Sequence, residues 1–376
     1  MNCSNRLYNH ITRTLRMWKD LLRTVLIGFM GLILCSGEGM ADTVNSYRKD
    51  TDDPDLVTVV GRQGKVVAVS PTVVTLERSN QTLDFPVNEI ESICFDDEPV
   101  TLPTIRLAVQ TGDFLHASEA LSQIDTSGIA NPLVLQDIEY FKAYIAAQEV
   151  LTPGVSKENI RDGVRLMANF LKNHPESWRM LKATEIVGDL AVASGALEQA
   201  VRFYEPLVTA PWTDYQMRGQ IAIANIDLAA GRIDQAKTGF EAVINNPETT
   251  PVAKRQKIVA RMGAARCLAQ QKNLDQAIVA MEEVVKLTNP EDTPLCAAAC
   301  NLLGDFFLED GKKNEALLAY LRVDLLYSNV RLEHIKALQH LAQLWHERGK
   351  IDRESEVRQK LNDRYGIALD IVLDEE

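Results

Sequence analysis

The chain has 376 residues, of which 46% are hydrophobic and 24% are charged, values typical of folded globular proteins rather than of disordered chains. Its formal net charge is −12; because residues 1–41 carry five cations and two carboxylates, the rest of the chain carries −15. Phosphate backbones and anionic membrane surfaces repel so acidic a chain, and we expect no nucleic-acid partner. The length predicts two to three structural units.

Residues 1–41 have the pattern of an export signal. A basic region is followed by an apolar run from Val25 to Leu34 and by small residues at Gly39 and Ala41. An apolar run of about ten residues is too short to span a bilayer. The pattern therefore predicts a signal peptide cleaved after Ala41 and export to the periplasm or cell envelope of a bacterium.

A lipoprotein is the alternative for this segment, with Cys35 as the residue that takes the lipid. That signal requires a small residue just before the cysteine, where this chain has Leu34. Contact with a membrane is expected only through such lipidation.

Residues 42–55 are polar and charged, and they predict a flexible linker. Residues 56–98 instead contain short β-branched runs in which apolar and polar residues alternate between Gly, Pro and Asn. The runs are 57–60, 65–70, 72–78, 82–87 and 90–95. They predict a small antiparallel β module, SH3-like or Sm-like, that packs against the next part of the chain. Its few basic residues favour a structural role over nucleic-acid binding.

The segment 61–65, Gly-Arg-Gln-Gly-Lys, resembles part of a phosphate-binding loop. Such a loop needs a glycine where this chain has Val59 and a Ser or Thr where it has Val66. A hairpin turn accounts better for both glycines.

From residue 104 to 364 the pattern is helical and repeats. A four-residue motif ending in alanine recurs at 197–200, 233–236, 274–277 and 313–316, so that the alanines are 36, 41 and 39 residues apart. A bulky residue follows each alanine by four positions, and a small residue precedes it by twelve. These offsets place small and bulky side chains on facing sides of two helices, so each repeat is expected to be a helical hairpin. A lone hairpin cannot bury its apolar face, and the copies must stack.

The residues expected to pack the hairpins together are Gly188, Ala200, Tyr204, Ala236, Phe240, Ala277, Gly304, Ala316 and Tyr320. The turns within the hairpins carry Gly195, Gly231 and Gly311, with Lys272 at the same place in the remaining repeat. The charged helix 352–364 fits a polar cap, and residues 365–376 are expected to form an acidic C-terminal tail.

This spacing resembles the tetratricopeptide repeat, a helical hairpin of about 34 residues with small and aromatic residues at fixed positions. Pro175, Pro211, Pro247 and Pro290 lie near the proline that closes each repeat. Divergent copies follow Gly112 and Gly163, and a degenerate last copy contains Trp345 and Gly349. The period exceeds that of the family, so longer connections are expected. The resemblance implies a mainly α fold, a right-handed superhelix of hairpins whose concave groove holds segments of other proteins.

Chemistry-bearing residues form no recognisable catalytic or metal-binding pattern. Cys296 and Cys300 lie one helical turn apart but have no second ligand pair, so we expect them to pack as small core residues. His334, His340 and His346 are six residues apart and are expected to be solvated helix histidines. No nucleophile motif is present. We therefore expect no enzyme, no cofactor and no metal.

The resemblance places a partner-binding groove on the inner face of the first helix of each hairpin. Its residues would be Lys182, Glu185, Asp189, Arg218, Asn225, Met262, Arg266, Asn301, Asp305, Gln339 and Gln343. Amide, Arg and Asp side chains suit hydrogen bonding to an extended backbone. Because Asp189 stands where an Asn would complete a clamp for a terminal carboxylate, no such clamp is expected. An ordinary solvated helix face is the competing interpretation.

Two functions from different classes remain. The first is an exported, non-catalytic scaffold that binds other proteins or peptides through the groove. The alternative is an accessory or regulatory subunit of a cell-envelope enzyme or assembly complex, with the β module as its functional head. The sequence leaves the partner and the oligomeric state open.

Overall fold

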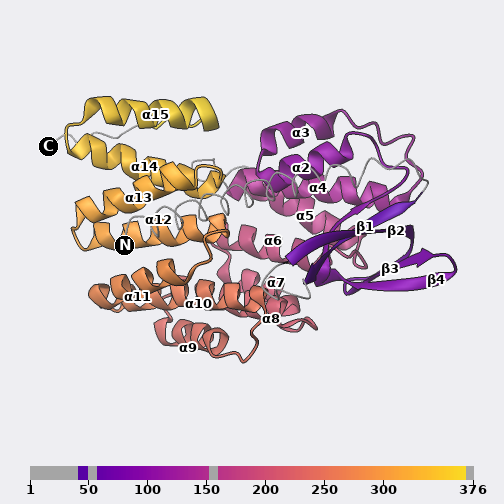
Figure 1. The fold of residues 1–376 in the computed structure, drawn as a ribbon, viewed down its shortest axis with the longest axis horizontal. Coiled ribbons are helices and arrows are strands. Elements are labelled where there is room, and N and C mark those ends of the chain that lie inside the picture. Colours follow the sequence, from indigo (N-terminus) through magenta and orange to yellow (C-terminus); the bar gives the residue numbers. More distant parts are fainter. Residues whose placement is uncertain (1–40, 50–56, 152–159, 370–376) are drawn as a thin grey trace, which may run out of the picture.

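The computed structural model describes residues 41–49, 57–151 and 160–369 (Figure 1). A five-stranded antiparallel sheet comes first, and helices occupy the remainder, as the predicted fold class requires. Residues 1–40 of the predicted signal peptide, 50–55 of the predicted linker and 370–376 of the predicted tail lie outside the described residues. In the described ranges, no helix is both long and apolar enough to cross a membrane.

The sheet has the strand order β4-β3-β2-β1-β5. Its elements are β1 (Asp42–Lys49), β2 (Val57–Val69), β3 (Val73–Arg78), β4 (Gln81–Pro86), the 3-10 helix η1 (Val87–Glu89) and β5 (Ile90–Cys94). β3 and β4 form a hairpin whose turn residues, Ser79 and Asn80, both have positive φ, as a tight two-residue hairpin requires.

The predicted linker is wrong for residues 42–49, which form β1 and pair with both β2 and β5. Val44 is its one fully buried apolar side chain, and polar contacts supply the rest. The Asp42 carboxylate accepts hydrogen bonds from the backbone N–H groups of Val66 (2.8 Å) and Asp96 (3.2 Å). Asn45 is buried and donates to the Ser92 hydroxyl. Because polar contacts rather than apolar side chains stabilise this strand, its amino-acid composition resembles that of a linker.

The hairpin predicted at Gly61 and Gly64 is also wrong, because β2 runs through both residues without a turn. Gly64 is needed for a different reason. A Cβ at this position would lie 2.5 Å from the carbonyl oxygen of Glu77 and 2.8 Å from the Leu76 side chain on β3. The glycine therefore permits close approach of two strands rather than a reversal of the chain.

The helices form consecutive antiparallel hairpins. They are α2 (Leu102–Thr111), α3 (Phe114–Ser122), α4 (Pro132–Leu151), α5 (Ile160–Asn173), α6 (Met180–Ala193), α7 (Leu197–Val208), α8 (Thr213–Ala229), α9 (Ile233–Ile244), α10 (Pro251–Gln270), α11 (Leu274–Leu287), α12 (Thr293–Glu309), α13 (Lys313–Leu326), α14 (Arg331–Glu347) and α15 (Ile351–Tyr365). The predicted turn glycines all adopt the left-handed conformation, with φ of 83° at Gly195, 76° at Gly231 and 72° at Gly311. Lys272 adopts the same conformation, with φ of 66°, although it carries a side chain.

Small residues let the paired helices approach each other closely. A Cβ on Gly188 would lie 2.6 Å from the Tyr204 ring, and one on Gly304 would lie 2.7 Å from the Tyr320 ring. The four motif alanines, Ala200, Ala236, Ala277 and Ala316, are fully buried. Phe240 is also fully buried, and a Cβ on Gly263 in the next hairpin would collide with its ring. The spacing seen in the sequence is therefore the packing seam of the array.

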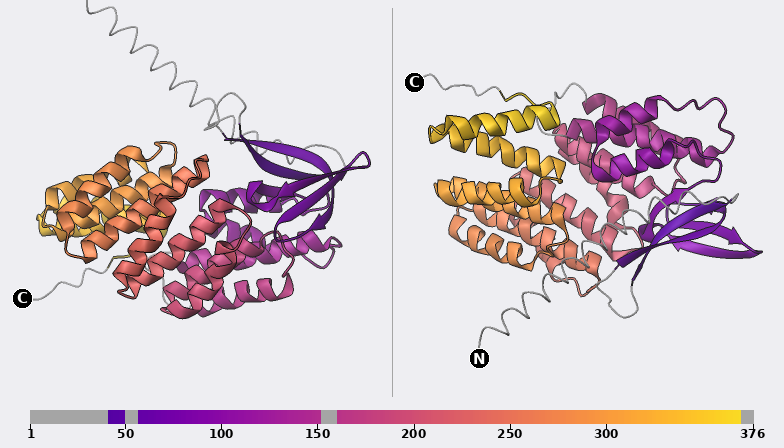
Figure 2. Two further views of the ribbon diagram at one scale, coloured as in Figure 1. Left: turned by 90° about the horizontal axis from the view of Figure 1, so that it is seen from below. Right: turned by 45° about the horizontal axis from the view of Figure 1, so that its top comes forward.

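The hairpins stack into a curved solenoid whose two ends approach each other (Figures 1 and 2). The even-numbered helices contact one another in succession, α4 with α6, α8 with α10, and α12 with α14, so they form the inner, concave layer. A Cβ added to Gly112, at the end of α2, would lie 4.0 Å from the Cβ of Arg331, at the start of α14. The inner face therefore curves around a partly enclosed space.

The sheet and the first helices share one hydrophobic core that extends from Val44 to Leu190. A buried ion network strengthens this junction. Arg106 pairs with Glu98 (2.6 Å), and the Asp137 carboxylate, 2% exposed, lies between Arg106 (3.3 Å) and Arg179 (2.7 Å). The sheet is therefore fixed to the array by both apolar packing and charge pairing.

Candidate functional site

A cavity of about 730 Å³ lies on the concave side of the solenoid, between α4, α6, α8 and α10. Five of the predicted groove residues line it: Lys182, Glu185, Asp189, Arg218 and Asn225. Residues not predicted for the groove also line it, among them Leu151, Val192, Val252, Arg255, Gln256 and Val259. Four successive hairpins therefore contribute side chains to one concave site.

Charges at one side of this cavity compensate each other. Glu185 accepts hydrogen bonds from Lys182 on its own helix (3.0 Å) and from Arg218 on α8 (Nε to Oε1, 3.0 Å). Burial would raise the pKa of Glu185, but the two cations outweigh burial and hold that pKa below its usual range. This triad joins α6 to α8 and leaves no single strong charge there for a ligand.

Asp189 has a different environment from Glu185. The Tyr204 hydroxyl donates a hydrogen bond of 2.6 Å to its carboxylate, which water can reach although protein surrounds it on most sides. Burial in this concave surface raises the pKa of Asp189 to about 6, and the Tyr204 hydrogen bond offsets part of that effect. Asp305 repeats this arrangement with Tyr320, again at 2.6 Å. In the next hairpin Phe240 occupies the position of Tyr204, and Asn225 occupies the position of Asp189. Phe240 has no hydroxyl that would need a carboxylate acceptor.

The amides of Asn225 and Gln256 are the uncommitted polar groups of the cavity, since neither forms a hydrogen bond with any other described residue. Arg255, by contrast, pairs with Asp292 at 2.6 Å. The wall around the two amides is apolar and partly exposed, with Val192 38% and Val252 45% exposed. Free amides surrounded by apolar side chains can bind a peptide backbone and an apolar side chain at the same time.

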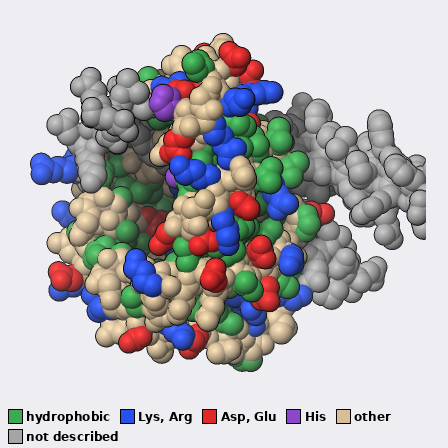
Figure 3. Space-filling view, turned by 90° about the vertical axis from the view of Figure 1, so that its left-hand side faces the viewer, with side chains coloured by type: hydrophobic (Ala, Val, Ile, Leu, Met, Phe, Trp, Pro, Cys, Tyr) green, Lys and Arg blue, Asp and Glu red, His purple; other side chains and the backbone are tan. Residues whose placement is uncertain are grey.

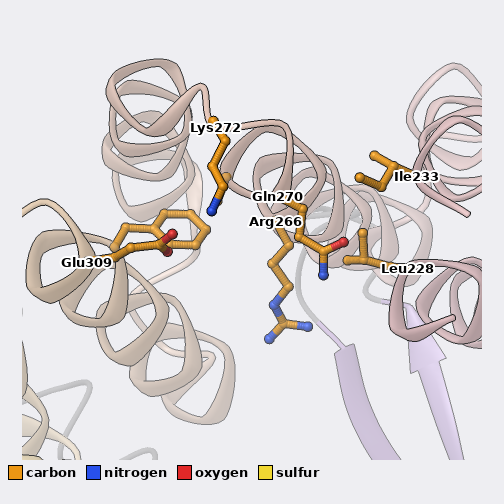
Figure 4. Close-up of a pocket in the computed structure, with 8 residues that line it drawn as sticks. Leu228, Ile233, Arg266, Gln270, Lys272 and Glu309 are labelled. Atoms are coloured by element: carbon orange, nitrogen blue, oxygen red, sulfur yellow. The ribbon is translucent and has the colours of Figure 1, made fainter. Parts of the chain in front are cut away.

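Arg266 lies outside this cavity and lines a second one of about 450 Å³, together with Leu228, Ile233, Ala269, Gln270, Lys272, Phe306 and Glu309 (Figure 4). Met262, one turn earlier on α10, is buried. The two cavities are neighbours on α10, because Val259 and Arg266 are seven residues, or two helical turns, apart.

The other predicted groove residues are not brought together with these. Asn301 differs from the prediction, because its side chain is buried and donates to the backbone oxygen (2.9 Å) and carboxylate (2.8 Å) of Glu333 on α14. Gln343 is exposed and contacts Glu347 on the same helix. Gln339 is half-buried and lines neither cavity.

The histidine prediction is wrong for His334, which is fully buried. Its ring nitrogens form hydrogen bonds with Asp324 on α13 (2.8 Å) and with the Tyr365 hydroxyl on α15, so this histidine joins the last three helices, α13, α14 and α15. Cys296 and Cys300 are buried free thiols, as predicted. Within the described part of the chain, no group of three or more His, Cys, Asp or Glu side chains could hold a metal.

Gln256 and Val252 escaped the sequence-based prediction because they lie before the stretch that the repeat spacing marks. Counted back from the small residue of its hairpin, α10 has a longer N-terminal part than α6. This extra length adds a helical turn to the inner face. Thr250-Pro251 is the signal that could have revealed the start: the Thr250 hydroxyl accepts from the N–H of Ala253, and Pro251 occupies the first turn.

The end view of the solenoid shows cations and carboxylates interspersed, with no patch of one sign (Figure 3).

Comparison with known proteins supports the repeat assignment for part of the chain. Residues 207–324 match the family described as tetratricopeptide repeat-like domain. No curated protein sequence matches. Among solved structures, apo RapI is similar at 12% identity, over 70% of this chain and 98% of that one, with a TM-score of 0.49. The quorum sensor NprR from B. thuringiensis is similar at 10% identity, over 71% and 81%, with a TM-score of 0.47. A tetratricopeptide repeat protein from Parabacteroides merdae gives 14% identity, 70% and 91% coverage and a TM-score of 0.41. The part of the chain that matches the family model covers the hairpins from α8 to α13.

Proposed function

We propose that this protein is a non-catalytic scaffold that binds an extended segment of another protein along its concave face. The observation that carries the proposal is the cavity between α4, α6, α8 and α10, in which two free amides, Asn225 and Gln256, lie among apolar side chains. An extended peptide needs hydrogen-bond partners for its backbone and an apolar surface for alternate side chains, and this cavity offers both.

The charges of the cavity support a peptide over a small anionic ligand. Lys182 and Arg218 are already paired with Glu185, and Arg255 with Asp292. A ligand that required a strong positive charge here would have to break these pairs. A neutral backbone with an apolar side chain would leave them intact, and the amides of Asn225 and Gln256 could each donate and accept.

A selection from a random twelve-residue peptide library displayed on phage tests the proposal. Peptides selected by the full mature chain should bind the N225A/Q256A double variant about 10-fold or more weakly, because each lost hydrogen bond contributes about 0.5–1.5 kcal/mol. The matched control is Q235A/Q276A, which removes two amides exposed on α9 and α11. Failure to select any peptide, or equal binding to both double variants, would refute the proposal.

We also propose that the protein is exported, on the pattern of residues 1–41. β1 begins at Asp42, directly after the expected cleavage site. Mass spectrometry of the protein purified from a bacterial host should give a mature N-terminus at Asp42. A lipid on Cys35 would favour the lipoprotein alternative, and an intact N-terminus in the soluble cell fraction would contradict export.

A further inference from the structure

Arg266 is a cation without a partner on the concave face. Its guanidinium forms no hydrogen bond or ion pair with any described residue. Figure 4 shows the side chain extending into the open space between the helix that carries Glu309 and the one that carries Leu228. The side chain is exposed, yet partial burial by the surrounding helices lowers the pKa of Arg266, and attraction to the carboxylates of Asp305 and Glu333 offsets only part of that effect.

The two carboxylates whose charges act on Arg266 already have hydrogen-bond partners of their own. Asp305 accepts from the Tyr320 hydroxyl (2.6 Å) and lies 3.5 Å from the His340 ring nitrogen. Glu333 accepts from Asn301 (2.8 Å) and from Lys336 (2.8 Å). Neither lies within ion-pair distance of Arg266, so the arginine stays free to bind an external anion.

The cavity around Arg266 combines positive charge with an apolar wall. Two cations, Arg266 and Lys272, and one carboxylate, Glu309, line it. Leu228, Ala269 and Phe306 also line it and are almost fully buried. In such surroundings a guanidinium binds a planar carboxylate through two parallel hydrogen bonds.

We infer that Arg266 pairs with the carboxylate of an Asp or Glu side chain in the protein segment that lies along the concave face. This inference rests on the proposed function and adds to it the charge of the partner. The distance between the two cavities also sets a spacing. Two turns of α10 separate Val259 from Arg266, about 10 Å, which an extended peptide covers in about three residues. The partner therefore carries an acidic residue about three positions from the apolar residue that enters the larger cavity.

The same phage selection, carried out in parallel with Arg266→Gln, Arg266→Glu and a control, tests this inference. The control is Arg261→Gln, which removes an exposed arginine on another face of α10. The native chain should enrich Asp or Glu at one fixed position. Synthetic copies of the selected peptides should bind R266Q about 10- to 100-fold more weakly, since hydrogen bonds between charged groups contribute about 1.5–3 kcal/mol, and should bind R261Q unchanged. R266E should select Lys or Arg at that position.

The outcomes separate the two claims. Peptides that depend on Asn225 and Gln256 but bind R266Q within about twofold of the native chain would overturn the role of Arg266 and leave the groove in place. If the native chain selects no peptide, the proposed function fails, and this inference fails with it. Circular dichroism melts of each variant verify that a loss of binding does not come from unfolding.

Discussion

The N-terminal and C-terminal regions of this protein are stabilised in different ways. The sheet and helices α2 to α6 share one core, closed by the buried pairs of Asp137 with Arg106 and Arg179. Beyond α6 the core divides into smaller clusters, each between neighbouring hairpins. Stability should therefore be cooperative in the first region and close to a sum of neighbour terms in the second. The cavity between α4, α6, α8 and α10 lies where the two regions meet.

Ala200→Glu should have the largest effect and tests the neighbour-by-neighbour description of the array. Ala200 is fully buried between α6 and α7, and an unpaired carboxylate there should cost about 3–5 kcal/mol or more. Hydrogen exchange should show loss of protection in α6 to α8, with α12 to α15 still protected. Gln199→Glu introduces the same charge at an exposed neighbouring position and should change little. An unchanged melting curve for A200E would refute the seam assignment.

Asp137→Ala tests the single core of the N-terminal region. It leaves Arg106 and Arg179 buried without their shared carboxylate, which should lower the free energy of unfolding by about 3–5 kcal/mol. Protection from hydrogen exchange should fall together in the sheet and in α2 to α6. Asp162→Ala, which removes a 71% exposed carboxylate, is the control. Loss of protection confined to α4 alone would contradict a shared core.

The sequence alone indicates the burial of Ala200, but it does not indicate the network around Asp137. The seam of the array follows from small and bulky residues at fixed local spacing, so Gly188, Ala200 and Tyr204 could be assigned from the sequence alone. The Asp137 network joins residues that lie far apart in the chain, and no local period marks it. β1 could not be predicted for the same reason, since its buried Asn45 finds its partner 47 residues later.

The candidate site was predictable only in part. Repeat register placed Asn225 and Arg266 on the inner face, because both follow the small residue of their hairpin. Register could not show that Asn301, at another inner position, is buried against Glu333. Nor could it show that Arg218 pairs with Glu185, because which polar groups compensate one another depends on the approach of neighbouring helices.

Asp189→Asn should have a moderate, pH-dependent effect at the meeting point of the two regions. The pKa of Asp189 is raised to about 6 in the folded chain, so between about pH 4 and 6 the folded state binds a proton that the unfolded state does not. Native stability should therefore rise as pH falls through this window. Because water reaches the carboxylate, we expect an effect of about 1 kcal/mol at most.

Thermal melts at several pH values measure this effect. D189N should be slightly more stable than the native chain at pH 7.5, and the difference should vanish near pH 4.5. Asp162→Asn should show no such convergence. A constant difference between D189N and the native chain across the range would contradict the raised pKa.

Lys272→Gly should have an effect of similar, small size, a gain in stability confined to the array. Lys272 occupies a left-handed turn that glycine occupies in the hairpins at Gly195, Gly231 and Gly311. Relief of the strained backbone should raise the free energy of unfolding by about 1 kcal/mol. Gly231→Lys should lower it by a similar amount, and both changes are measurable by urea denaturation. A loss of stability in K272G would show that the lysine side chain contributes more than its backbone costs.

Photo-crosslinking in cells is the most direct test of the claim that partners bind the concave face. A photoreactive amino acid replaces Val259 on the inner face of α10 or Val279, 57% exposed, on α11. Mass spectrometry should find partner peptides attached at position 259, and far fewer at 279. Partner peptides attached at 279 but absent at 259 would contradict the account.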